Sequence, residues 1–392
     1  MNNLRHVFAW ASIALIFISS PLSGQTAPEQ QAYSYAQQLY QDGLYEIAIE
    51  QYRQYLANYP RGNQRPEAAL QIGEAYYQLG DYEQALKAFL QVDLDYPGTD
   101  EALEGLWSVG ESYEALGRFE EAARAFNRLY VYYPDSERAP RALIRGGADA
   151  QKAGNEDLAV ELLQTAIDEY YQSAVANDAR IQLAKVYRQQ LEFRMAWTEL
   201  ERALNNTNDK NQRGVIILEQ AKTAEQLFTP ERAEELYLQI VEEFEESSLI
   251  NEARLELGRL AIIQKNYTAA EEYLIQVENS ESADYRLRAL EYHGDLFWQQ
   301  GAFEEAKGYY MQALNLEAPL EIRQALFLKS ALAAEKMGDF NQAFQQLQTI
   351  TDREVTGDID ESILKAAYDH LASSAVGIER YRDALTALNN LK

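Results

Sequence analysis

The sequence contains no cysteine, only three histidines and only nine prolines among its 392 residues. The lack of cysteine excludes a disulfide framework, a thiol nucleophile, a thiolate metal site and the acylated cysteine of a bacterial lipoprotein. Scarce proline together with 47% hydrophobic residues favours a helical protein with a core over a disordered chain.

Motifs for catalysis are also missing. Two of the histidines, His293 and His370, fall at single positions in segments expected to be helical, without a metal-ligand spacing. The sequence has no Gly-rich phosphate loop, no nucleophile elbow and no two-histidine helix motif. We therefore expect a non-enzymatic protein with no catalytic residue, no metal site and no cofactor.

The N-terminus has the layout of a secretory signal peptide. Arg5 is followed by the apolar run Val7–Ile18 and by the small residues of Ser19–Gly24. The run is shorter than the about 20 residues of a membrane span. We predict a signal peptide over residues 1–24 and a polar leader over 25–30, so that the mature chain would be periplasmic and without a membrane span. An uncleaved anchor is the alternative.

The chain is strongly acidic, with a formal net charge of −27. Such a surface repels nucleic acid and anionic lipid over most of its area. We therefore expect no nucleic-acid partner. The charge is explained by solubility alone or by a specific cationic partner, and the sequence leaves both open.

A repeated unit organises the rest of the chain and is clearest over Leu103–Pro134. Gly110 is expected where two helices approach closely, and Gly117 at the tight turn between them. Ala122 is the small contact residue of the second helix, and Pro134 ends that helix. The pattern resembles a tetratricopeptide repeat, whose two helices are called helix A and helix B.

The pattern recurs ten times, with a period of 37 residues over most of the chain. The turn position is occupied by Gly43, Gly80, Gly117, Gly154, Leu191, Phe228, Lys265, Gly301, Gly338 and Glu379. The helix B alanine follows five residues later each time. The sequence therefore predicts an all-α fold, a right-handed superhelical solenoid of about ten helix–turn–helix repeats over residues 31–392.

Each repeat is longer than the 34 residues usual for this family. The extra residues place Thr99, Ser136, Ser173 and Ser247 where they could cap the next helix A. This long repeat resembles those of tetratricopeptide proteins of the bacterial envelope, of the CpoB and BamD type. The resemblance implies a scaffold that binds protein or peptide segments, in envelope assembly or cell division.

Two segments depart from the regular pattern. The polar run Asn205–Asn211 predicts a loop and a possible hinge near residues 205–212, and an alternative interpretation splits the solenoid into two arms there. At the C-terminus, no polar capping helix follows the tenth repeat, so Leu385, Leu388 and Leu391 would be partly uncovered. Either this end docks on a partner, such as a second copy, or the chain is the start of a longer protein, such as a cell-envelope enzyme.

Helix A is expected to line the concave groove, and one column of groove positions is mostly apolar. These side chains either pack against the neighbouring helix or take up a peptide. The flanking charges change from acidic to basic along the chain, which indicates either ordinary salt bridges or a site for an acidic peptide. The candidate partner-binding residues are Tyr33, Tyr77, Trp107, Glu111, Arg141, Lys185, Arg188, Lys222, Arg259 and Trp298.

Overall fold

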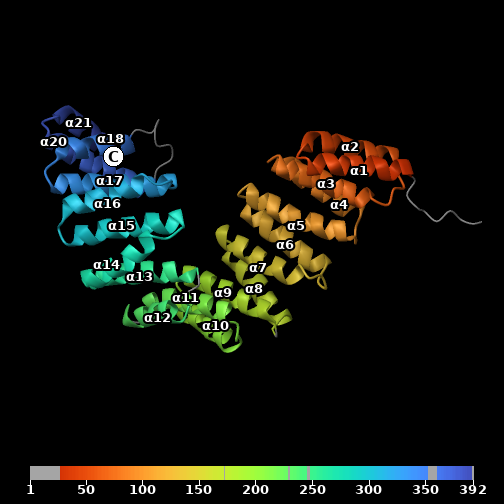
Figure 1. Cartoon of the computed structure of the whole chain (residues 1–392), viewed down its shortest axis with the longest axis horizontal. Coiled ribbons are helices and arrows are strands. Elements are labelled where there is room, and N and C mark those ends of the chain that lie inside the picture. The colour runs from red at the N-terminus through yellow and green to blue at the C-terminus, as the bar shows by residue number, and fades with distance from the viewer. Residues whose placement is uncertain (1–26, 172, 228–229, 245–247, 352–359, 391–392) are drawn as a thin grey trace, which may run out of the picture. The chain divides into compact units, whose positions relative to one another are not determined.

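The computed structural model describes residues 27–171, 173–227, 230–244, 248–351 and 360–390. This part of the chain contains twenty helices in ten consecutive pairs and no strand. Figure 1 shows their order along the chain. The expected all-α repeat architecture is confirmed. The predicted signal peptide, Phe228, Ser247 and Leu391 lie outside the described residues.

The first helices of the pairs correspond to the predicted A helices. They are α1 (Ala27–Gln41), α3 (Arg65–Gln78), α5 (Asp100–Ala115), α7 (Ala139–Lys152), α9 (Ala174–Gln189), α11 (Lys210–Leu227), α13 (Leu249–Ile263), α15 (Ala283–Gln299), α17 (Leu320–Lys336) and α20 (Glu361–Gly377). The second helices correspond to the B helices. They are α2 (Tyr45–Asn58), α4 (Tyr82–Asp95), α6 (Phe119–Tyr132), α8 (Glu156–Glu169), α10 (Phe193–Asn205), α12 (Pro230–Glu243), α14 (Tyr267–Glu278), α16 (Phe303–Leu314), α18 (Phe340–Thr351) and α21 (Tyr381–Asn390).

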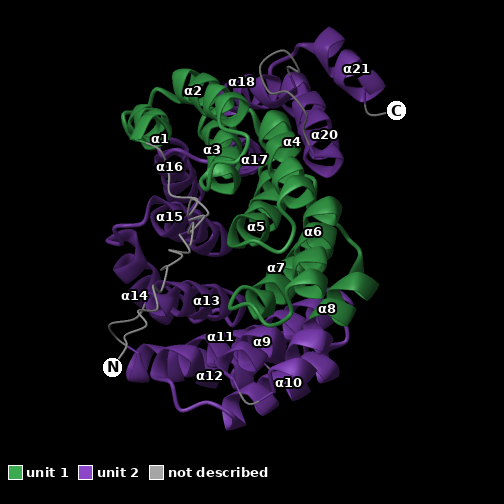
Figure 2. Cartoon of the chain, turned by 90° about the vertical axis from the view of Figure 1, so that its right-hand side faces the viewer, with its two compact units in different colours: residues 1–162 green, residues 163–392 purple. Residues whose placement is uncertain are grey.

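The chain divides into two compact units, residues 1–162 (unit 1) and 163–392 (unit 2), shown in green and purple in Figure 2. The division falls within α8 and not at the polar run that we considered as a hinge. That run forms the end of α10, a loop over residues 206–209 and the start of α11.

The turn between the helices of a pair has the same backbone conformation throughout the described repeats. Every predicted turn residue that the structure describes has a positive φ, for example 70° at Gly117. Leu191, Lys265 and Glu379 adopt φ of 63°, 62° and 63°, although side chains disfavour this region. The repeat geometry therefore persists where the glycine of the motif is lost.

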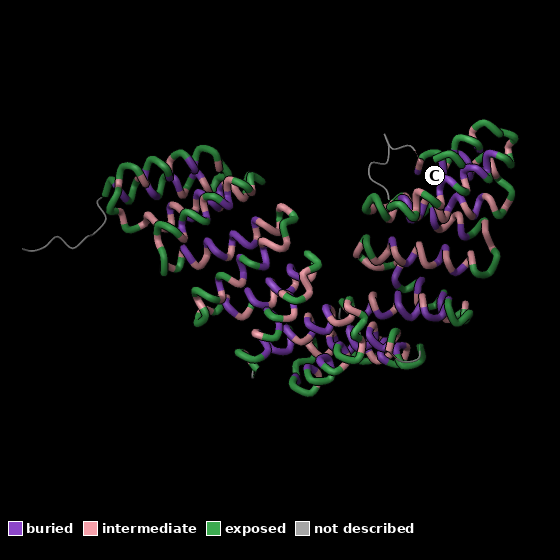
Figure 3. The backbone as a smooth tube through the Cα atoms, turned by 180° about the vertical axis from the view of Figure 1, so that it is seen from behind, coloured by how far each residue is buried: buried purple, intermediate pink, exposed green. Residues whose placement is uncertain are grey.

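Small residues at the predicted positions let the two helices of a pair pack closely. All ten helix B alanines are buried, from Ala48 to Ala384. A Cβ atom placed on Gly110 would lie 2.5 Å from the Phe126 ring, so this glycine is needed for the approach of α5 to α6. Buried positions recur along the helices of both units in Figure 3. Each pair thus contributes one layer of core.

The helix starts differ in part from the predictions. Thr99 caps α5, since its Oγ1 accepts a hydrogen bond from the N–H of Ala102 at 3.2 Å. Ser136 likewise accepts from the N–H of Ala139 at 3.2 Å. The prediction for Ser173 is wrong, because its hydroxyl donates to the Tyr170 carbonyl oxygen at 2.8 Å and makes no cap.

The first helix begins at Ala27, within the segment assigned to the polar leader. Its Glu29 is buried and accepts a hydrogen bond from the Tyr55 hydroxyl at 3.1 Å, which ties the start of α1 to α2. Burial and this bond raise the pKa of Tyr55 to about 12. No helix within the described residues combines the length and hydropathy needed to cross a bilayer.

Candidate functional site

Trp107 is the centre of a cluster of aromatic and charged side chains on α5, on α6, on α7 and at the residue before α7, within unit 1. Its half-buried ring contacts Phe126 edge-on, with ring centroids 5.2 Å apart. The guanidinium carbons of Arg138 and Arg145 lie 4.8 and 5.1 Å from its centroid. Such cation–π contacts hold the ring and both guanidinium groups in fixed positions.

Three carboxylates of α5 complete this Trp107 cluster. Arg138 donates to Glu104 at 2.6 Å, and Arg145 donates to Glu111 at 2.7 Å and to Glu114 at 2.8 Å. The side chains of these arginines and of Glu104 and Glu111 are about one third exposed. Arg141, one turn from either arginine, is exposed and has no partner among the described residues. The cluster therefore offers a free cation beside fixed ion pairs.

Two carboxyl groups near this cluster have raised pKa values, although one of them, Asp149, is paired with Lys152 at 3.1 Å. Burial, together with the neighbouring charges of Glu104 and Glu111, raises the pKa of Glu74. Asp149 on α7 is fully buried, and burial together with a hydrogen bond to Glu114 raises its pKa to about 7. These two carboxyl groups are therefore protonated more easily than ordinary carboxyl groups.

The other two candidates in unit 1 are placed differently. Tyr33 is buried, with its ring centroid 5.8 Å from that of Tyr52 and 5.6 Å from that of Tyr55. Its assignment as a groove residue is wrong, because it forms the core of the first helix pair. Tyr77 is half-buried and packs edge-on against Tyr82 at 5.1 Å.

The apolar column of helix A also lies mainly in the core. Its members Leu70, Ile181, Leu218 and Leu255 are buried, so the column packs against neighbouring helices and forms no exposed stripe.

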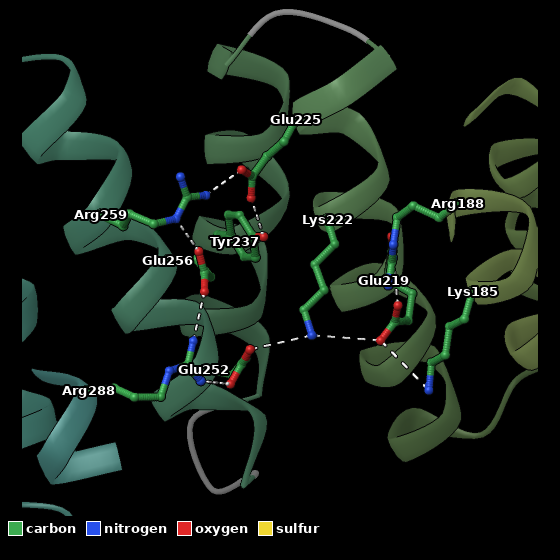
Figure 4. A network of polar contacts seen from close by, with 10 residues as sticks. All are labelled: Lys185, Arg188, Glu219, Lys222, Glu225, Tyr237, Glu252, Glu256, Arg259 and Arg288. Atoms are coloured by element: carbon green, nitrogen blue, oxygen red, sulfur yellow. Dashed lines mark hydrogen bonds and ion pairs between the residues drawn. The ribbon is translucent and has the colours of Figure 1, made fainter. Parts of the chain in front are cut away.

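In unit 2, the four basic candidates belong to an ion-pair network that runs across α9, α11, α13 and α15 (Figure 4). One centre of this unit 2 network is Glu219, whose side chain is only 7% exposed. Its carboxylate lies 2.7 Å from Arg188, 4.0 Å from Lys185 and 3.8 Å from Lys222. Three cations therefore share one nearly buried carboxylate.

The network continues through two more glutamates. Glu252 contacts Lys222 at 3.4 Å and Arg288 at 2.9 Å. Glu256 contacts Arg288 at 3.1 Å and Arg259 at 2.6 Å.

A final carboxylate connects the network to the core. Arg259 also pairs with Glu225, which accepts a hydrogen bond from the buried Tyr237 hydroxyl at 2.7 Å. Burial and the Glu225 charge raise the pKa of Tyr237. The basic helix A positions that the sequence indicated are therefore paired with glutamates of the same and of neighbouring helices.

The glutamates of the unit 2 network and Arg288 were not among the predicted site residues. A signal for them exists in the spacing. Glu219 follows Arg188 by 31 residues, and Glu225 precedes Arg259 by 34. These separations fall one or two helical turns short of the 37-residue period, so they place opposite charges side by side on consecutive A helices. Arg145 and its glutamates show the same two separations.

Trp298 and the two histidines have local packing partners. Trp298 is half-buried and packs edge-on against Phe303 at 5.1 Å. His293 is buried, contacts Glu278 and stacks on Tyr309 at 4.9 Å. His370 lies 2.7 Å from Glu335. No group of three or more His, Asp or Glu side chains in the described residues could hold a metal ion.

Helix pairs with a common turn, a buried alanine and a close glycine contact define a helical-repeat protein. Comparison with known families then identifies the type of repeat. A profile described as "Tetratricopeptide repeat" matches residues 33–98 and 70–142, and one described as "Tetratricopeptide repeat-like domain" matches residues 204–335. The chain belongs to the tetratricopeptide repeat family, whose members generally act as non-catalytic scaffolds for protein–protein interaction.

The chain is also similar to several solved structures. A tetratricopeptide repeat protein from Parabacteroides merdae is 12% identical over 78% of this chain and 98% of that one, with a TM-score of 0.47. PilW, a type IV pilus biogenesis factor, is 19% identical over 57% and 97%, with a TM-score of 0.39. MamA from Desulfovibrio magneticus is 16% identical over 47% and 97%, with a TM-score of 0.36. No curated protein sequence matches this chain significantly.

Proposed function

We propose that the protein is a non-catalytic scaffold of the periplasm that binds a protein or peptide segment on the helix A side of unit 1. The observation that carries the proposal is the Trp107 cluster, in which an aromatic ring and two arginines are held in place before any partner binds. Such preorganisation lowers the entropic cost of binding, and tryptophan and arginine are the residues that most often dominate protein interfaces.

The unit 2 network supports a structural role better than a binding role. An acidic peptide at Lys185 or Lys222 would compete with Glu219, which already contacts both. At the Trp107 cluster, Arg141 needs no such exchange, because no described residue forms a hydrogen bond or an ion pair with it. We therefore assign the partner site to unit 1.

The periplasmic location rests on the N-terminal pattern of Arg5, the apolar run over residues 7–18 and the small residues that follow. The resemblance to envelope repeat proteins supports a role in envelope assembly or cell division. Fractionation of cells that express the full chain tests the location. We expect a mature form cleaved after Gly24 in the periplasmic fraction, and uncleaved protein in the cytoplasm would overturn this part of the proposal.

The binding site is tested by capture of envelope proteins on purified wild-type and variant chains. Trp107→Ala should reduce recovery of the specific partner about tenfold, the loss typical of an interface anchor. Tyr132→Ala, which removes an exposed aromatic side chain on the helix B side, is the matched control and should leave recovery unchanged. Equal recovery with both variants would exclude the Trp107 cluster as the site.

A second candidate function is self-association through the last helix pair. Leu385 and Leu388 on α21 are 61% and 46% exposed, and Val376 on α20 is 53% exposed. A second copy could cover these exposed apolar side chains. Light scattering tests this candidate: a Leu385→Lys variant should convert an associated wild type into a monomer, and a monomeric wild type would exclude it.

A further inference from the structure

Unit 2 contains a polar cavity of about 730 Å³, next to the loop over residues 206–209. Its volume is within the range of about 300–1,000 Å³ that is usual for small-ligand sites. Nine of its ten lining residues carry amide, hydroxyl or charged side chains, and the tenth is Ala174. The polar run noted in the sequence thus forms one wall of a cavity.

Hydrogen bonds between α9 and the start of α11 fix the walls of this cavity. The Asn177 amide donates to Gln212 Oε1 at 3.2 Å, and the Gln212 amide donates to Asp178 Oδ1 at 2.8 Å. The Gln212 backbone N–H donates in turn to Asp209 at 2.7 Å, which caps α11. A ligand would therefore meet side chains that are already oriented.

Two lining residues carry polar atoms without partners among the described residues. Asn177 is only 3% exposed, and its Oδ1 accepts no hydrogen bond. The Arg180 side chain is 12% exposed, and its Nε and Nη1 donate none, with Glu199 3.6 Å from Nε. An unpaired buried donor or acceptor costs free energy, which a bound group with matching chemistry would recover. The lining thus has an acceptor, on Asn177, and donors, on Arg180, that have no hydrogen-bond partner among the described residues.

We propose that this cavity binds a neutral carbohydrate. A sugar hydroxyl both donates and accepts, so one hydroxyl can serve Asn177 Oδ1 and another the Arg180 guanidinium. The Tyr171 ring, 63% exposed, offers an apolar face with a polar tip for the ring of a sugar.

Other ligand classes fit the cavity less well. The carboxylates of Asp178 and Asp209 disfavour an anion. A peptide could supply both kinds of hydrogen bond, but the lining offers no apolar pocket for its side chains.

The test is titration of the purified chain with N,N′-diacetylchitobiose and, separately, with cellobiose, followed by calorimetry and ligand-observed NMR. We expect a dissociation constant of about 1 mM or tighter for at least one of the two disaccharides. The pair also distinguishes acetamido sugars from plain ones. Inorganic phosphate and triglycine are titrated under the same conditions as an anion and a peptide.

Arg180→Met and Tyr171→Ala should each weaken disaccharide binding about tenfold. Arg202→Met is the matched control and should change the affinity less than twofold. Arg202 contacts the same Glu199 at 2.5 Å but does not line the cavity. Because Arg202 still pairs with Glu199, Arg180→Met leaves no carboxylate without a cation. Tyr171→Ala alters an exposed side chain, so it tests the site even if Arg180→Met fails to fold.

Three results would overturn the proposal. The first is no binding of either disaccharide at about 10 mM. The second is binding of phosphate or triglycine in place of the disaccharides. The third is disaccharide binding that Tyr171→Ala and Arg180→Met leave unchanged, which would place the sugar elsewhere on the chain.

Discussion

The Trp107 cluster in unit 1 and the unit 2 network use the same types of charged residue on their A helices, but they balance charge differently. Glu219 shares three cations and is nearly buried, whereas Glu74 has a raised pKa and Asp149 is buried beside another carboxyl group. Unit 2 therefore uses its charges to join helices. Unit 1 retains two carboxyl groups with raised pKa values, together with the exposed Arg141, which has no partner among the described residues and is available to a binding partner.

The largest expected effect concerns the glycines at which the two helices of a pair approach closely in each unit. Gly110→Ala would place a Cβ atom 2.5 Å from the buried Phe126 ring, which packs against Trp107. Because this ring has to move, the variant should destabilise unit 1 by about 3 kcal/mol. Gly258→Ala in unit 2 meets the aliphatic side chain of Leu274 at 2.7 Å, which can adjust, so its cost should be smaller. Urea unfolding measures both. Gly308→Ala meets no atom within 4 Å and is the control, with no loss expected.

The next effect compares a nearly buried carboxylate with one that is about one third exposed. Glu219→Gln leaves three cations without their shared partner and should cost about 2 to 3 kcal/mol. Glu104→Gln removes a partner of Arg138 that is one third exposed, and should cost less than about 1 kcal/mol. Thermal unfolding of the two variants measures the difference. Equal costs would contradict the distinction between the two regions.

The third effect is a pH dependence that only unit 1 should show. The pKa of Asp149 is about 7 in the folded chain and about 4 in the unfolded chain. At a pH between these two pKa values, the folded state therefore binds one proton more than the unfolded state. Stability should therefore fall as pH rises, by about 2 kcal/mol between pH 5.5 and 7.5. Hydrogen exchange of α7 at several pH values measures this loss. Asp149→Asn should remove it, and a variant with an unchanged profile would show that another group is responsible.

The smallest effect concerns the turns. Leu191→Gly replaces a side chain that is mostly exposed at φ 63°, so it should stabilise unit 2 by about 0.5 to 1 kcal/mol. The reverse change in unit 1, Gly117→Ala at φ 70°, should destabilise by a similar amount. Thermal unfolding is sensitive enough to detect both shifts. A loss of stability in Leu191→Gly would mean that the positive φ carries no strain.

The repeat architecture was predictable because it depends on local residue types that recur at a fixed period. Gly117, Ala122 and Gly110 each act within one helix pair, so their spacing alone defined the turn, the buried contact and the close approach. Even where Leu191 replaced the glycine, the alanine five residues later kept the register.

The candidate site was less predictable because exposure and pairing depend on neighbouring repeats. Tyr33 was assigned to the groove, but Tyr52 and Tyr55 enclose it. The basic residues of unit 2 were identified without Glu219, because Lys185 and Arg188 lie 34 and 31 residues before it on another helix. Lys222 is three residues from Glu219 on α11, but this pair alone does not reveal that three cations share the carboxylate. Comparing charges across the repeat period would have found it.

The central claim is that a partner binds the helix A side of unit 1, and site-specific photo-crosslinking tests it most directly. A photoreactive residue replaces Arg141 on α7 in one chain and Arg124 on α6 in another, both of which are exposed. After irradiation in cells, we expect a discrete adduct of one partner protein from position 141 and none from position 124. Adducts from position 124 alone, or the same adducts from both positions, would contradict the claim.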